Sequence, residues 1–154
     1  MKNLFFLTVA IFLFFGCGET SNNKLDSDDY NSKEERIEKL KVEIKSFSDF
    51  QDAEFELFNV NGFHNDRTSI PGASSLDYKF VVKIDSSNIS KWTCKMKEVQ
   101  LKDYNYSWTT EIVKNRKQNW RFKSKPQFFK REGVNTIVIV YKNEGILFKR
   151  IIIE

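Results

Sequence analysis

The sequence predicts an α+β domain, in which an antiparallel sheet of about six strands is accompanied by two helices. Three observations lead to this fold class. Apolar and polar side chains alternate over residues 77–85 with the period of two that is typical of a half-buried strand. Two β-branched runs, 137–141 and 146–153, are joined by the turn KNEG, whose glycine suits a hairpin. Ser32 and Glu35 form a capping-box pattern ahead of an amphipathic stretch.

The remaining elements follow from the same periodicities. The N-terminal helix is predicted over 33–48, because its apolar residues form one stripe at helical spacing. A second, short helix is predicted from Ile89 to Val99 on the same grounds. The strands are expected at 55–60, 77–85, 104–112, 119–125, 137–141 and 146–153. The order is therefore α-β-β-α-β-β-β-β, with the helices to one side of the sheet; an all-β sandwich decorated by two helices is the alternative.

The first eighteen residues have the features expected of a targeting signal. Lys2 precedes an apolar run, Leu4 to Phe15, in which Thr8 is the one polar residue. The length of this run suits the hydrophobic region of a signal peptide. It is too short for a membrane-spanning helix, which needs about 20 apolar residues. The sequence Gly16-Cys17-Gly18 follows directly, where a cleavage site belongs.

Residues 1–18 resemble a bacterial lipoprotein signal peptide, in which a small residue precedes the cysteine that receives lipid. Gly16 matches that pattern. Phe14 and Phe15 depart from it, because leucine and then a small residue are usual there. The alternative is an ordinary secretory peptide in which Cys17 has no role.

The resemblance implies that residues 1–16 are removed as a signal peptide and that Cys17 is lipidated. The several fatty-acid chains on such a cysteine would hold the protein stably at the cell envelope. Gly18 is not the aspartate that marks inner-membrane retention in some Gram-negative bacteria. The resemblance therefore implies the outer membrane of a Gram-negative bacterium.

Composition divides the mature chain into a tether and one domain. Residues 18–32 contain three Asp, three Ser and three Asn, and such a polar segment cannot bury enough apolar surface to become ordered. We therefore expect 17–32 to be a lipid-anchored flexible tether. Residues 33–154, which are rich in aromatic and β-branched side chains, are expected to form a single globular α+β domain.

Cysteine and histidine usage limits the chemistry of the domain. Cys17 and Cys94 are the two cysteines, so lipidation of Cys17 leaves no intramolecular disulfide. With His64 as the single histidine, a zinc site of the usual kind is not expected, and no cofactor motif is found. Helical spacing places Cys94 away from Trp92, which predicts an exposed thiol.

The two halves of the chain differ in charge. Residues 1–90 hold 10 basic and 15 acidic side chains, and residues 91–154 hold 15 basic and 6 acidic ones. The alternation over 119–125 places three cations on one face of a predicted strand, with the aromatic side chains on the other. This candidate anion-binding site consists of Arg121, Lys123 and Lys125. The alternative is a solvated strand face that protects a sheet edge.

The segment 61–76 is long for a connection within a compact domain, and such loops are often functional. Its candidate partner-contact residues are Phe63, His64, Asp66 and Arg67. A serine, a histidine and an aspartate so close in sequence are weak support for catalysis, because triad members come from separate segments. No nucleophile-elbow motif is present.

The sequence therefore predicts a membrane-tethered lipoprotein that acts as a non-catalytic binding module at the cell envelope. Its partners would be the membrane, through the lipid anchor, and an anionic envelope component or a protein. Nucleic acid is an unlikely ligand, given the secretory address. Two alternatives remain open: an inhibitor or immunity-type protein that uses loop 61–76, and an enzyme whose site is assembled from scattered residues.

Overall fold

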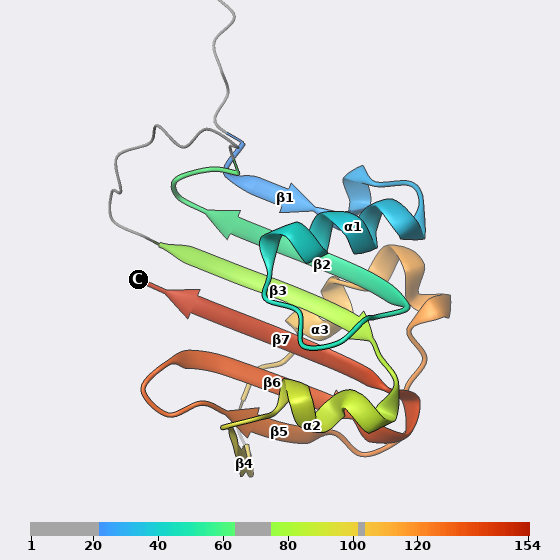
Figure 1. The fold of residues 1–154 in the computed structure, drawn as a ribbon, viewed down its shortest axis with the longest axis vertical. Coiled ribbons are helices and arrows are strands. Elements are labelled where there is room, and N and C mark those ends of the chain that lie inside the picture. The colour runs from blue at the N-terminus through green and yellow to red at the C-terminus, as the bar shows by residue number, and fades with distance from the viewer. Residues whose placement is uncertain (1–21, 64–74, 102–103) are drawn as a thin grey trace, which may run out of the picture.

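A computed structural model describes residues 22–63, 75–101 and 104–154. They form one sheet of seven antiparallel strands in the order β1-β2-β3-β7-β6-β5-β4 (Figure 1). The α+β class is confirmed, with one strand more than expected. The strands are β1 (Lys24–Asp26), β2 (Asp52–Asn59), β3 (Leu76–Lys83), β4 (Lys97–Val99), β5 (Gln127–Lys130), β6 (Asn135–Tyr141) and β7 (Ile146–Ile153). The α-helices are α1 (Lys33–Glu43), α2 (Ile89–Trp92) and α3 (Trp108–Glu111).

The capping box at the start of α1 is formed as predicted. The Ser32 hydroxyl accepts a hydrogen bond from the Glu35 backbone N–H, and the Glu35 carboxylate accepts one from the Ser32 backbone N–H, both at 3.1 Å. The helix ends at Glu43, short of the predicted residue 48. The Ser46 hydroxyl donates to the carbonyl of Ser48, and such local side-chain bonds compete with helical ones.

The segment expected to be a tether contributes a strand. Lys24, Leu25 and Asp26 pair with Phe58, Leu57 and Glu56 of β2, and Leu25 is buried. The prediction of a flexible tether is therefore wrong for residues 24–32, whereas residues 17–21 lie outside the described residues. One buried leucine is enough to order this segment, because the edge of β2 supplies hydrogen-bond partners for its backbone and an apolar surface for Leu25.

The hairpin of β6 and β7 agrees with its sequence signature. Asn135 to Tyr141 pairs with Ile152 to Ile146 in antiparallel register. Gly145 has a φ of 63°, in the left-handed region that favours glycine. A side chain there would collide with the backbone carbonyl of Ile84. The glycine is thus required both by the turn and by the close approach of the backbone at Ile84.

Two predicted strands are absent, and the second predicted helix, like the first, is shorter than expected. The expected strand 104–112 contains α3, because the Asn105 side chain accepts a hydrogen bond from the Ser107 backbone N–H and starts a helical turn. The expected strand 119–125 follows the 3-10 segment η3 (Lys114–Asn119) and is irregular. The second helix ends at Trp92, and part of its predicted range is the edge strand β4.

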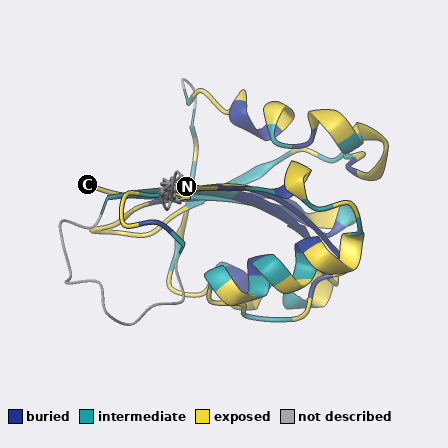
Figure 2. Ribbon diagram, turned by 90° about the horizontal axis from the view of Figure 1, so that it is seen from above, coloured by how far each residue is buried: buried dark blue, intermediate teal, exposed yellow. Residues whose placement is uncertain are grey.

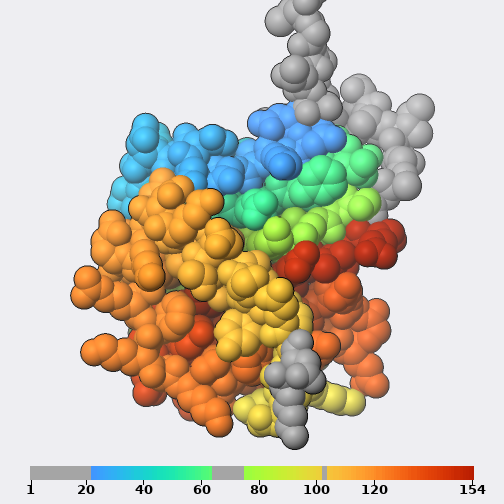
Figure 3. All heavy atoms as spheres, turned by 180° about the vertical axis from the view of Figure 1, so that it is seen from behind, coloured from blue at the N-terminus to red at the C-terminus, as the bar shows by residue number. Residues whose placement is uncertain are grey.

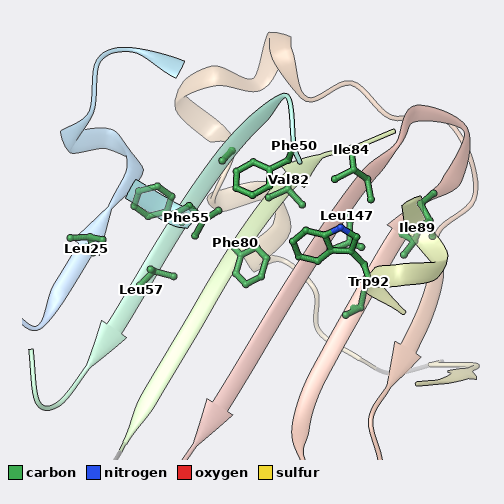
Figure 4. Close-up of a cluster of buried hydrophobic side chains, with 14 residues drawn as sticks. Leu25, Phe50, Phe55, Leu57, Phe80, Val82, Ile84, Ile89, Trp92 and Leu147 are labelled. Carbon is green, nitrogen blue, oxygen red and sulfur yellow. The ribbon is translucent and has the colours of Figure 1, made fainter. Parts of the chain in front are cut away.

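Helical segments cover both faces of the sheet, not one (Figure 2). On one face, α1 and α2 bury a core to which Leu40 belongs. Phe55, Phe80 and Trp92 are part of the same core (Figure 4). On the other face, α3 and η3 bury a second core around Phe148. The sheet therefore forms the middle of three layers, and the C-terminal half of the chain supplies the cover of the second face.

Candidate anion-binding surface

The basic segment, defined here as residues 114–125, is fixed to the sheet by Trp120. This side chain is buried, and its indole Nε1 donates a hydrogen bond of 3.3 Å to Oε1 of Glu54 on β2. In Figure 3 this part of the chain, in orange, lies over the sheet on the face seen from behind. The inward direction predicted for Trp120 is confirmed, although no strand presents it.

Glu54 is the centre of a buried ionic network. Its side chain is 1% exposed, and it lies 2.8 Å from an Arg116 nitrogen and 3.5 Å from Nε of Arg36. Arg36 also donates to the carboxylate of Asp52 at 3.0 Å. Burial raises the pKa of the Glu54 carboxyl, although a hydrogen bond from Ser27 and the two arginine charges act in the opposite direction. The network joins α1, β2 and η3.

Arg116 extends this network to the N-terminal segment. Its guanidinium lies 3.0 Å from the carboxylate of Asp28 and donates to the backbone carbonyls of Ser27 and Tyr30 at 3.4 and 3.2 Å. The Asn115 amide also donates to Asp28. Arg116 therefore has a structural role, because its donors are used within the fold. It is not one of the cations available to a ligand.

The predicted anion-binding residues Arg121, Lys123 and Lys125 are all exposed, and Phe122 between them is half-buried. The predicted alternation of exposure is thus present, but an irregular segment produces it. None of the three cations has a described carboxylate within 4.0 Å. Each therefore remains available to an external anion.

Glu144 holds the backbone of these cations in place. Its carboxylate accepts hydrogen bonds from the backbone N–H groups of Lys123 and Ser124 at 2.8 and 2.9 Å, and from the Ser124 hydroxyl. Hydrogen bonding, first of all from that hydroxyl, lowers the pKa of Glu144 to about 2. The nearby carboxylate thus stays ionised and is engaged with the backbone. It orders the basic segment without pairing with its side chains.

An apolar depression of about 570 Å³ lies within the basic segment. It is lined by Lys117, Gln118, Trp120, Arg121, Phe122 and Lys123. The Phe122 ring stacks on Tyr141 with a centroid separation of 4.0 Å, which fixes its orientation. Phe122, which is half-buried, therefore lines the same surface as the cations, whereas the sequence predicted that it would be buried in the core.

The predicted partner loop can be located only in part. Phe63 is half-buried and stacks on Tyr78, with ring centroids 6.0 Å apart. His64, Asp66 and Arg67 lie outside the described residues. The inhibitor hypothesis, which depends on this loop, stays a prediction.

Two further reactive side chains lie apart from the basic segment. The exposure predicted for Cys94 is confirmed. Lys149 lies on the opposite face of the sheet, with its ammonium nitrogen 5.4 Å from the Phe47 ring centroid, and burial lowers its pKa to about 8. Lys149 has no described carboxylate within 4.0 Å, and the charge of Arg131 also lowers its pKa. Within the described ranges, no group of three or more metal-ligating side chains was found.

The Glu54 network is the feature that sequence reasoning missed. Glu54 and Glu56 are two positions apart on β2, so they point to the same face of the sheet and look equivalent in sequence. In the structure, however, Glu54 is buried and Glu56 is half exposed. The difference arises because β1 ends opposite Glu56, and Arg36 fills the strand edge beyond it. No local pattern signals this contact, since its partners are 18 and 62 positions away in the chain.

Comparison of the chain with known proteins gave no assignment: no family model, no curated protein and no solved structure matches it.

Proposed function

We propose that this protein is an envelope lipoprotein, anchored through Cys17, whose domain binds an anionic envelope component without catalysing a reaction. The observation that carries the proposal is the set of exposed cations Arg121, Lys123 and Lys125 on an ordered backbone, with no acidic partner among the described residues. Such a cluster creates a positive local potential that attracts anions.

The anchor supports the envelope location. The apolar run from Leu4 to Phe15 and the Gly16-Cys17 pair have the arrangement of a lipoprotein signal. In the part of the chain that the structure describes, no helix has the length and apolar character needed to cross a bilayer. We propose that attachment at Cys17, in the Gly16-Cys17 pair, supplies the membrane association.

The chemistry of the surface defines the ligand class. Three cations suit carboxylate, sulfate or phosphate groups, and the neighbouring Phe122 ring offers an apolar contact. An acidic polysaccharide combines both features, because its sugar rings carry apolar faces between charged groups. Lipid head groups share the charge. Nucleic acid fits the charge as well, but the secretory signal that we propose for residues 1–16 argues against it.

Replacing Arg121, Lys123 and Lys125 together by glutamine should weaken binding to anionic vesicles or to a soluble acidic polysaccharide. A cation near an anionic membrane surface contributes about 1 kcal/mol, so three contribute about 3 kcal/mol, or about a hundredfold in affinity. Wild-type binding should fall as salt is raised, since exposed charges are screened over about 8 Å at physiological ionic strength. Equilibrium binding at several salt concentrations provides the measurement.

The matched control is the replacement of Lys33, Lys91 and Lys95 by glutamine, which removes the same charge from exposed positions elsewhere. The melting temperature of both triple variants should stay close to that of the wild type. Equal loss of binding in both would mean that net charge alone attracts the anion. Absence of salt-dependent binding by the wild type would contradict the proposal.

A further inference from the structure

The end of the sheet at which the chain enters the domain carries three exposed apolar side chains. Of the large apolar side chains that are well exposed in the described ranges, Val60, Val134 and Ile153 lie here, and two lie elsewhere. Val60 follows the last residue of β2, Val134 precedes the first of β6, and Ile153 is the last of β7. We call these three residues the apolar rim.

Strand register shows that the apolar rim lies at one end of the sheet. Asn59 pairs with Leu76, and Leu76 pairs with Ile153. Ile152 pairs with Asn135, so the start of β6 lies in the same row. Three separate strand ends therefore place these apolar residues at the same end of the sheet. Figure 1 shows the starts of β1 and β3 and the C-terminus at this same end.

The described chain begins beside the apolar rim. The backbone carbonyl of Asn23 accepts a hydrogen bond from Asn59, and that of Asn22 accepts one from Phe63. Asn22 is five residues after Cys17, and five residues span at most about 18 Å. The eight residues of β3 give the sheet a length of about 25 Å. A lipid on Cys17 would thus hold this end of the sheet close to the bilayer.

We propose that the apolar rim is a membrane-contact surface, which rests on the lipid head-group region of the bilayer that holds Cys17. This inference depends on the anchor in the proposed function and adds the orientation of the domain. The anchor makes the contact intramolecular, so a weak apolar contact is enough to bias the orientation. The exposed Glu154 beside Ile153 limits the contact to head-group depth.

This orientation determines which anions the basic segment can reach. The backbone of Lys123 is bound to Glu144, and Glu144 belongs to the turn between β6 and β7 at the opposite end of the sheet. The basic segment therefore points away from the anchoring membrane. Its ligand approaches from the aqueous side, as an acidic polysaccharide would, and is not a lipid of the membrane that holds Cys17.

Depth-dependent fluorescence quenching tests this orientation. In a Cys94→Ser background, a fluorophore is attached to Asn135→Cys, next to the rim residue Val134, or to Lys142→Cys in the turn at the opposite end; both wild-type side chains are exposed. The lipidated protein is reconstituted into phosphatidylcholine and phosphatidylglycerol vesicles that contain a head-group quencher. We expect the rim label to be quenched at least about threefold more than the turn label. The rim label would touch the head groups, whereas the turn label would lie about 25 Å from them, at the other end of the sheet.

A second preparation separates failure of the anchor from failure of the orientation. The chain from Gly18, preceded by six histidines, is held on vesicles by a nickel-chelating lipid, so that native lipidation is not needed. Preferential quenching of the rim label in this preparation supports the membrane-contact surface even if Cys17 proves not to be lipidated. Equal quenching of the two labels, stronger quenching of the turn label, or quenching of neither would overturn it.

Discussion

A chain that begins at Ser32 should fail to fold stably, although it keeps the capping box and every element from α1 onward. It lacks β1 and with it Leu25, whose buried side chain packs against Phe55 and Leu57 in the core of that sheet face. It also lacks Asp28, an ion-pair partner of Arg116. Loss of a buried leucine side chain alone costs about 2–5 kcal/mol, against a total stability of about 5–15 kcal/mol.

Chemical denaturation of the chain from Ser32 and the chain from Gly18 gives the comparison. A point variant refines it, because Leu25→Ala should lower the free energy of unfolding by about 2–5 kcal/mol. Asp29→Ala is the matched control in the same segment, since Asp29 is exposed and forms no ion pair with a described residue. Equal unfolding midpoints for the two chain lengths would show that the segment is a tether after all.

Glu54→Ala should be the most destabilising single substitution on β2 that involves a charged residue. It leaves the guanidinium of Arg36, which is 3% exposed, and that of Arg116 without their shared carboxylate. Removing one partner of a buried ion pair costs about 3–5 kcal/mol, because the remaining charge stays desolvated. The indole N–H of Trp120 also loses its acceptor, so the basic segment should be less firmly held.

The control for this substitution is Glu56→Ala, two residues along the same strand. Glu56 pairs with Lys79 at 3.2 Å, but its side chain is 49% exposed. An exposed pair of this kind contributes about 0–1 kcal/mol. Thermal unfolding of the two variants should therefore differ by several degrees or more. Similar melting temperatures would mean that the Glu54 network does not hold the layers together.

The parts of the fold that were predicted correctly depend on neighbouring residues. Period-two alternation in β3, the β6–β7 hairpin with its left-handed Gly145, and the capping box of Ser32 are all encoded within a few positions. Segments 104–112 and 119–125 also alternate, yet neither is a strand. Aromatic residues of both segments, among them Trp108 and Trp120, pack on the second face of the sheet, so their alternation reflects burial against that face and not strand pairing.

The candidate site divides in the same way. Exposure of the three cations follows from local alternation and was predicted. The carboxylates that hold the basic segment in place were not predicted. Glu54, Glu144 and Asp28 bind this segment from distant parts of the sequence. The prediction that the tether reaches residue 32 was wrong for a related reason, since β1 begins at Lys24. Composition describes what a segment can bury by itself, whereas Leu25 is buried by β2 and its neighbours.

Metabolic labelling with a fatty-acid analogue in a Gram-negative host tests the lipid anchor, on which the proposed envelope location depends. The wild-type chain should incorporate the label and partition into the detergent phase, because several acyl chains on Cys17 give stable membrane attachment. Cys17→Ser should incorporate no label and leave the detergent phase, whereas Cys94→Ser should behave as the wild type. Equal labelling of the wild type and Cys17→Ser, or labelling of neither, would contradict the account.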